Sequence, residues 1–111
     1  MMDSRAITIR QLNDELRVFH TGGKIVMSAN LANGAIEEIE DIMNAVAAFN
    51  DFTENNDPYR EHDCAFVEVE GFGRVMFKID YYNNDMSAGS EDPSDRSQTT
   101  RVMTVMLPED Y

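Results

Sequence analysis

The sequence predicts an α+β domain in which two helices pack on one face of a small, mostly antiparallel sheet. Two segments carry apolar residues at helical spacing, and four shorter segments are rich in β-branched and aromatic residues. Their order is α-β-α-β-β-β, for which an antiparallel sheet with helices on one face is the natural packing. The 111 residues predict a single domain over 1–111.

The first helix is expected from Ser4 to about Phe19, with Ser4 as its N-cap. The residues of its apolar side are Ile9, Leu12, Leu16 and Phe19. The polar side consists of Arg10, Asn13, Asp14 and Arg17. After His20, the glycines Gly22 and Gly23 are expected to end the helix by supplying a left-handed residue. The short, β-rich segment 24–28 that follows predicts a strand.

The second helix is expected over about 34–50. Its apolar stripe is Ile36, Ile39, Ile42, Met43, Val46 and Phe49. Acidic residues occupy its first two turns, where the positive end of the helix dipole stabilises each nearby carboxylate by about 0.3–1 kcal/mol. Helix stability is therefore a sufficient structural explanation for these acids.

Two strands, 63–70 and 74–82, predict a hairpin with a three-residue loop at 71–73 and glycine in the left-handed position. The expected pairs are Val69 with Val75, Val67 with Phe77, Ala65 with Ile79 and Glu70 with Arg74. The same register places Asp63 opposite Tyr81 and Cys64 opposite Asp80. Segment 83–98 lacks apolar periodicity and is expected to be a long functional or mobile loop. Segment 99–107 is apolar on both faces, which predicts an interior strand in which Met103 and Met106 fill the core.

Negative charge is concentrated in residues 34–70, which hold eleven carboxylates and one base, Arg60, for a local charge of −10 within a total of −12. Such a field repels nucleic acid and anionic membranes and attracts basic surfaces. Direct nucleic-acid binding and membrane association are therefore not expected, and a basic protein surface is the expected partner.

The single cysteine, Cys64, excludes an internal disulfide and favours a reducing compartment. No apolar run approaches the roughly 18 residues that a membrane span needs. A cytoplasmic location follows as the expectation. No cofactor is expected.

Several short motifs identify a resemblance. The most specific are NDPY (56–59), EHD (61–63), KIDYY (78–82) and the closing strand TRVMTVML (100–107). With these motifs the chain resembles a small bacterial family catalogued as domain of unknown function 3768. The resemblance implies a cytoplasmic bacterial protein often associated with mobile elements, and it carries no established activity.

The leading hypothesis is an interaction protein, an inhibitor that imitates nucleic acid and occupies the basic groove of a DNA-binding enzyme in a bacterial defence system. The predicted binding residues are Glu37, Glu38, Glu40, Asp41, Asp51, Glu54, Asp57 and Glu61. A soluble acidic domain with no role related to nucleic acid is the alternative, because acidic residues also serve solubility.

A second hypothesis is a small enzyme or ligand-binding domain at a corner formed by the EHD and KIDYY motifs. Its predicted residues are His62, Asp63, Lys78, Asp80 and Tyr81. His62 would be the general base, Asp63 or Asp80 its orienting partner, and Lys78 or Arg101 the anion holder.

Structural roles also account for this corner, with Asp57 capping the turn at Pro58 and with His62 and Asp63 fixing the loop to the sheet. A metal site is not expected because too few ligands lie together. The carboxylates around Cys64 disfavour a reactive thiolate, so a buried structural role is expected for it.

Overall fold

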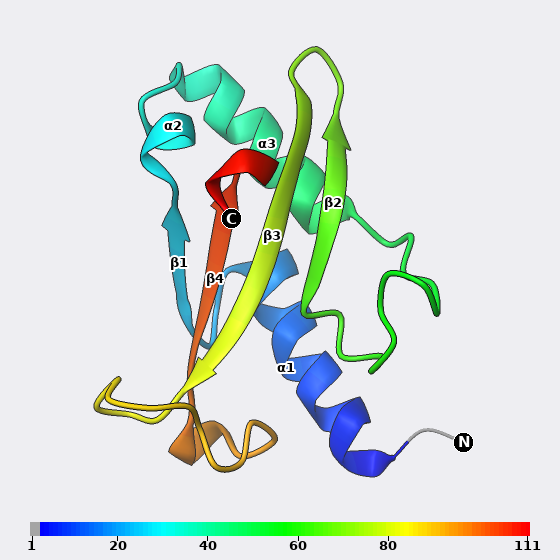
Figure 1. Ribbon diagram of the computed structural model, residues 1–111, viewed down its shortest axis with the longest axis vertical. Helices are drawn as coiled ribbons and strands as arrows, with labels where there is room; N and C mark the ends of the chain where they lie inside the picture. Colours follow the sequence, from blue (N-terminus) through cyan, green and yellow to red (C-terminus); the bar gives the residue numbers. More distant parts are fainter. Residues whose placement is uncertain (1–2) are drawn as a thin grey trace.

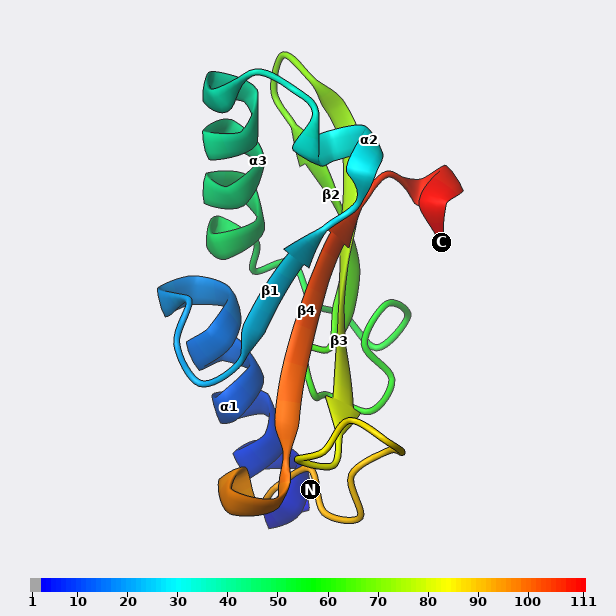
Figure 2. The same ribbon diagram turned by 90° about the vertical axis from the view of Figure 1, so that its left-hand side faces the viewer.

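The computed structural model describes residues 3–111, in which a four-stranded sheet carries two long helices on one face (Figures 1 and 2). The helices are α1 (Ser4–Phe19) and α3 (Ile36–Ala48). The strands are β1 (Lys24–Met27), β2 (Cys64–Val69), β3 (Gly73–Tyr82) and β4 (Thr100–Met106). Three short helices were not predicted: α2 (Ala29–Ala32), η1 (Arg96–Gln98) and η2 (Pro108–Asp110). Figure 2 places η2 on the sheet face opposite to α1 and α3.

The strand order is β1-β4-β3-β2, so β4 is interior as predicted and β2 lies at one edge. Strand β1 runs parallel to β4, with Ile25 opposite Met103, and the other two pairs are antiparallel. The predicted α+β class is confirmed, and the sheet is mixed. A parallel pair requires a long crossover connection, which here contains α3 and the hairpin.

The hairpin register differs from the prediction by two residues. Val69 pairs with Gly73, Val67 with Val75 and Ala65 with Phe77. The loop is again three residues long but consists of residues 70–72, with Gly71 at φ +79° and a bond from the Phe72 N–H to the Val69 carbonyl. A two-residue shift leaves every side chain on its predicted face, so the apolar pattern does not distinguish the two registers.

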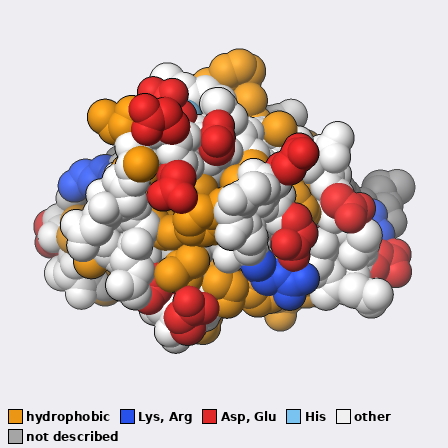
Figure 3. Space-filling view, turned by 90° about the horizontal axis from the view of Figure 1, so that it is seen from above, with side chains coloured by type: hydrophobic (Ala, Val, Ile, Leu, Met, Phe, Trp, Pro, Cys, Tyr) orange, Lys and Arg blue, Asp and Glu red, His pale blue; other side chains and the backbone are white. Residues whose placement is uncertain are grey.

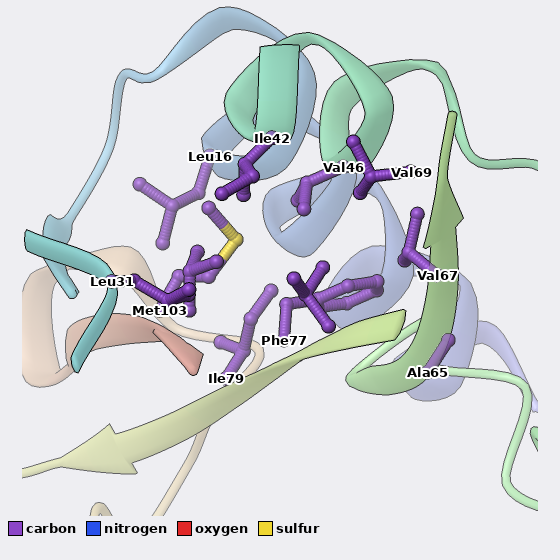
Figure 4. Packing of buried hydrophobic residues seen from close by; sticks show 12 residues of the cluster. Leu16, Leu31, Ile42, Val46, Ala65, Val67, Val69, Phe77, Ile79 and Met103 are labelled. Carbon is purple, nitrogen blue, oxygen red and sulfur yellow. The ribbon is translucent and has the colours of Figure 1, made fainter. Parts of the chain in front are cut away.

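The core lies between the sheet and the two long helices (Figure 4). Leu16, Val46, Val75, Phe77 and Met103 are fully buried there. Met103 fills this core as predicted, whereas Met106 is buried but does not belong to the core cluster.

Two residues of the predicted apolar stripes are exposed instead, Phe19 at 72% and Ile36 at 70%. Both are terminal residues of their helices, where the stripe runs past the packed surface.

Both predicted caps of α1 are corrected. Asp3 is the N-cap, and its carboxylate accepts a hydrogen bond from the Arg5 N–H at 3.0 Å. His20, rather than a glycine, takes the left-handed conformation at the C-cap with φ +60°. Its N–H donates to the Leu16 carbonyl at 2.9 Å, which satisfies one of the free carbonyls at the helix end.

Asn13 and Arg17, predicted on the polar side of α1, are buried. The Arg17 guanidinium donates to the carbonyls of Val46 at 3.0 Å and Phe49 at 2.7 Å, and so caps the end of α3. The Asn13 side chain accepts a hydrogen bond from Arg101 Nε of β4 at 2.9 Å. These hydrogen bonds inside the protein allow the two polar side chains to be buried, although the Nε atom of Arg17 has no partner among the described residues.

Candidate functional site

The predicted acidic residues of α3 lie on its water-facing side. Glu37, Glu38, Glu40 and Asp41 are all exposed. At about 100° per residue, Glu37, Glu40 and Asp41 point away from the buried Val46. Among residues 3–111, no ion pair or side-chain hydrogen bond involves any of the four carboxylates. Their charges are therefore available to a partner.

The other predicted acidic residues divide into two groups. Asp51 and Glu54 are exposed in the segment after α3, and Glu54 pairs with Arg60 at 3.4 Å. Asp57 is only 3% exposed, and it accepts the His62 N–H at 3.1 Å. Glu61 is half-buried and accepts the Tyr81 hydroxyl at 2.8 Å. Asp57 and Glu61 thus hold the loop in place and do not belong to the exposed acidic surface.

Two further acidic residues on the hairpin, Glu68 and Glu70, extend this surface and were missing from the predicted set. Both are exposed, and Glu68 pairs with Arg74 at 2.6 Å. Figure 3 views the end of the molecule at the hairpin and the start of α3, where acidic side chains are spread over the surface and basic ones are few. The concentration of charge over 34–70 was a signal for both residues, but their position beside α3 follows only from the fold.

The surface between α3 and β2 is hollowed. One hollow of about 310 Å³ is lined by Asp41, Ala45, Val69 and Glu70. The adjoining hollow of about 490 Å³ shares Ala45 and runs along the edge strand. Its remaining lining residues are Ala48, Phe49, Asp51, Phe66, Val67, Glu68 and Arg74. We call this continuous depression between α3 and β2 the edge trough.

His62 lies in a second polar site, formed by α1 and the 52–62 segment. A hydrogen bond of 2.9 Å joins its Nδ1 to the Asp14 carboxylate, and its Nε2 is 3.7 Å from Asp57 Oδ2. The imidazole stacks on the Phe52 ring at 3.8 Å between centroids. His62 and Arg60 both have positive φ, +55° and +60°, a backbone strain that clusters at ligand and active sites.

A cavity of about 210 Å³ opens beside the imidazole, lined by Arg10, Phe52, Thr53, Glu54, Asp57, Arg60 and His62. The partner of Nδ1 is the Asp14 carboxylate, which can only accept, so Nδ1 carries a proton, and Nε2 faces the Asp57 carboxylate. Arg10 and Arg60 also line the cavity, where Arg60 is paired with Glu54 at 3.4 Å, and a guanidinium group is suited to contact an anionic ligand.

The predicted catalytic corner is divided between the two faces of the sheet. Asp63 lies opposite Ile79, whose N–H donates to the Asp63 carbonyl at 2.7 Å, and Cys64 lies opposite Lys78. The imidazole of His62 bonds to Asp14 instead of Asp63 or Asp80, so the predicted orienting partners are wrong.

Both predicted anion holders are engaged elsewhere. Lys78 forms an ion pair with Asp80, and Arg101 is buried against Asn13. Tyr81 bonds to Asn13 and Glu61 on the helix-covered face.

On the uncovered face of the sheet, a cavity of about 440 Å³ is lined by Asp63, Cys64, Phe66, Met76, Lys78, Ile79, Asp80, Pro108 and Tyr111. Burial raises the pKa of the Asp63 carboxyl. Burial, with the Asp63 charge adding to it, raises the pKa of the Cys64 thiol, which keeps it protonated. The hydrogen bond from Lys78 to Asp80 raises the pKa of the Lys78 ammonium. The Cys64 thiol is therefore not activated as a nucleophile.

The buried polar groups under α1 are held in one protonation state. Burial raises the pKa of the Tyr81 phenol, with the hydrogen bond to Glu61 adding to the effect, so the phenol stays neutral. Burial lowers the pKa of the Arg101 guanidinium, which remains charged at neutral pH because its ordinary value is far higher. These groups support the fold and are not poised to transfer protons.

Within residues 3–111, no group of three or more histidine, cysteine, aspartate or glutamate side chains is arranged to hold a metal ion. Over the same residues, none of the helices is long and apolar enough to cross a membrane.

A family model described as protein of unknown function (DUF3768) matches residues 26–110, which is most of the chain. The chain belongs to this family. No curated protein and no solved structure matches the chain. The family description assigns no activity, so function is argued from the surfaces described above.

The raised pKa of Asp63 predicts a specific pH dependence of stability. The folded state favours the protonated carboxyl of Asp63. The contribution of this residue to folding stability is therefore fully present below the ordinary pKa of 3.8, and it is lost as the pH rises through the folded-state pKa. Relative to the wild type, Asp63→Asn should therefore raise the free energy of unfolding more at pH 7 than at pH 3, as measured by urea denaturation.

Asp85→Asn is the matched control with the opposite sign. Hydrogen bonds from Ser87 lower the pKa of the Asp85 carboxyl, so its contribution is present above the ordinary value of 3.8 and is lost as the pH falls. This substitution should decrease stability at pH 7 relative to pH 3. Equal responses of the two variants would contradict the assigned environments.

Proposed function

We propose that this DUF3768 protein is an acidic interaction protein that binds a basic protein surface. In its specific form, the proposal is an inhibitor that imitates nucleic acid and blocks a DNA-binding enzyme of a bacterial defence system. The observation that carries it is the set of exposed α3 carboxylates, Glu37, Glu38, Glu40 and Asp41, which have no ion-pair partner within residues 3–111.

The charge distribution supports this role in two ways. Unpaired surface carboxylates do not have to break an existing ion pair before they meet lysine or arginine side chains. A one-signed field also increases the rate at which an oppositely charged protein is captured, and this effect weakens as salt increases. A basic groove that binds DNA phosphates offers the complementary field.

The test is affinity capture from the native host, followed by binding measurements on the captured partner. The double variant Glu37→Gln and Glu40→Gln removes two exposed α3 charges. Each exposed pair contributes about 0.5 kcal/mol, so losing two pairs should increase the Kd about fivefold and make it depend less on salt. The control Glu91→Gln and Glu109→Gln removes the same charge at exposed positions outside α3 and β2.

A nucleic-acid-binding enzyme that is released by duplex DNA, with the control variant binding like the wild type, is the expected result. Equal weakening by both double variants would mean that only total charge matters. Capture of no nucleic-acid enzyme would contradict the inhibitor role and favour an acidic domain whose charges serve solubility.

A second candidate function is small-anion binding at the His62 cavity. It is favoured by the hydrogen bond of 2.9 Å between Asp14 and His62, which orients the imidazole, and by the arginines that line the cavity. This version replaces the predicted partners Asp63 and Asp80 with Asp14.

Sodium phosphate at millimolar concentration should shift the His62 ring resonances in two-dimensional NMR spectra. Arg60→Gln should weaken this response by about threefold or more, because a charge-assisted contact is lost. Arg74→Gln, on the hairpin, is the control and should have no effect. Absence of a phosphate-dependent shift, or equal responses in both variants, would exclude this function.

A further inference from the structure

Within residues 3–111, strand β2 leaves one edge of the sheet unpaired. It is the last strand in the order β1-β4-β3-β2, and Figure 1 shows no strand beside its outer edge. The bond from the Ile79 N–H to the Asp63 carbonyl fixes which residues face β3. In an antiparallel pair the backbone groups alternate in direction. Ala65 and Val67 therefore face β3, and the N–H and carbonyl groups of Phe66 and Glu68 point outward.

The edge trough keeps the space beside these outward groups open. Its α3 wall is formed by Ala45 and Ala48, whose methyl side chains extend only a short way from the helix. An added strand lies about 4.8 Å from its neighbour and needs such a channel. On the uncovered side of the strand, Phe66 is 55% exposed and offers an apolar contact.

The charges that flank the trough define what could occupy it. Asp41 and Asp51 lie on its helix side, and Glu68 and Glu70 lie on its strand side. The one base that lines it, Arg74, is paired with Glu68 at 2.6 Å. A second copy of this chain would bring the same acidic residues against each other, and like charges placed opposite one another across paired strands are destabilising.

We propose that the free edge of β2 accepts an extended basic segment of a partner protein as a fifth strand of the sheet. Backbone hydrogen bonds to Phe66 and Glu68 would supply affinity, as in other cases of β-strand addition. Lysine or arginine side chains of the segment would meet Asp41, Asp51 and Glu70, and small apolar residues would alternate with them. This inference rests on the proposed interaction role and specifies the form of the basic partner.

The test uses the synthetic peptide acetyl-VKVRVKV-amide as the probe and isothermal titration calorimetry as the readout. Two control peptides have the same sequence, one N-methylated at every valine and the other at every lysine and arginine. N-methylation removes N–H donors and keeps all side-chain charges. In a bound strand, the N–H groups of either the valines or the basic residues face β2, so only one of the two control peptides loses the donors that the edge uses. One control peptide should therefore bind at least about tenfold more weakly than the probe.

Protein variants give an independent comparison at one position. Glu68→Gln removes the charge and keeps the outward N–H, whereas Glu68→Pro removes both. Proline is tolerated at an edge position where its missing N–H would face solvent, and circular dichroism checks that each variant is folded. The expected result is a further loss of affinity, about fivefold or more, from the glutamine to the proline variant.

Several results would overturn the edge proposal. These are no binding of the probe to the wild-type chain, equal binding of all three peptides, and equal affinity of the two Glu68 variants. Self-association of the free chain in sedimentation experiments, abolished by Glu68→Pro, would assign the edge to a second copy instead. If the broader interaction role fails instead, a captured partner should bind the wild type and the α3 charge variant with the same affinity.

Discussion

Two buried arginines hold both long helices on the same face of the sheet, and the open surfaces of the protein depend on this arrangement. Arg17 extends from α1 to the last carbonyls of α3, and Arg101 extends from β4 to Asn13 of α1. Each arginine is almost completely buried. Removing one partner would leave a buried polar group unsatisfied, at a cost of about 1–3 kcal/mol or more for a charged group. Within residues 3–111, the opposite face carries only the short helix η2, and no strand pairs with the outer edge of β2.

This one-sided packing brings together charges that are separated in the sequence. Asp41 of α3 and Asp51 beyond its end line the same edge trough as the hairpin residues Glu68 and Glu70, because α3 packs over that part of the sheet. Concentrated negative charge attracts a basic protein without specifying how it docks. Unpaired backbone groups beside the charge provide directional hydrogen bonds. The two features together describe a partner that is both basic and locally extended.

Local patterns in the sequence predicted most of the fold, and long-range contacts account for the errors. The helical stripes, the three-residue hairpin loop and the interior position of β4 follow from periodicity and from glycine. The hairpin register was wrong by two residues because such a shift preserves the apolar face. The burial of Asn13 could not be predicted, because its partners Glu61, Tyr81 and Arg101 are brought to it only by the tertiary fold. The same limitation applies to His62, whose partner Asp14 is 48 residues away.

The availability of the β2 backbone is the central structural claim, and amide hydrogen exchange of the free protein in NMR tests it most directly. Phe66 and Glu68 should exchange quickly because their N–H groups face water, whereas Ala65 and Val67 should exchange slowly because theirs face β3. An alternating fast and slow pattern along β2 is the predicted result. Equally slow exchange at all four positions would mean that the edge is already covered in solution, and would contradict the account.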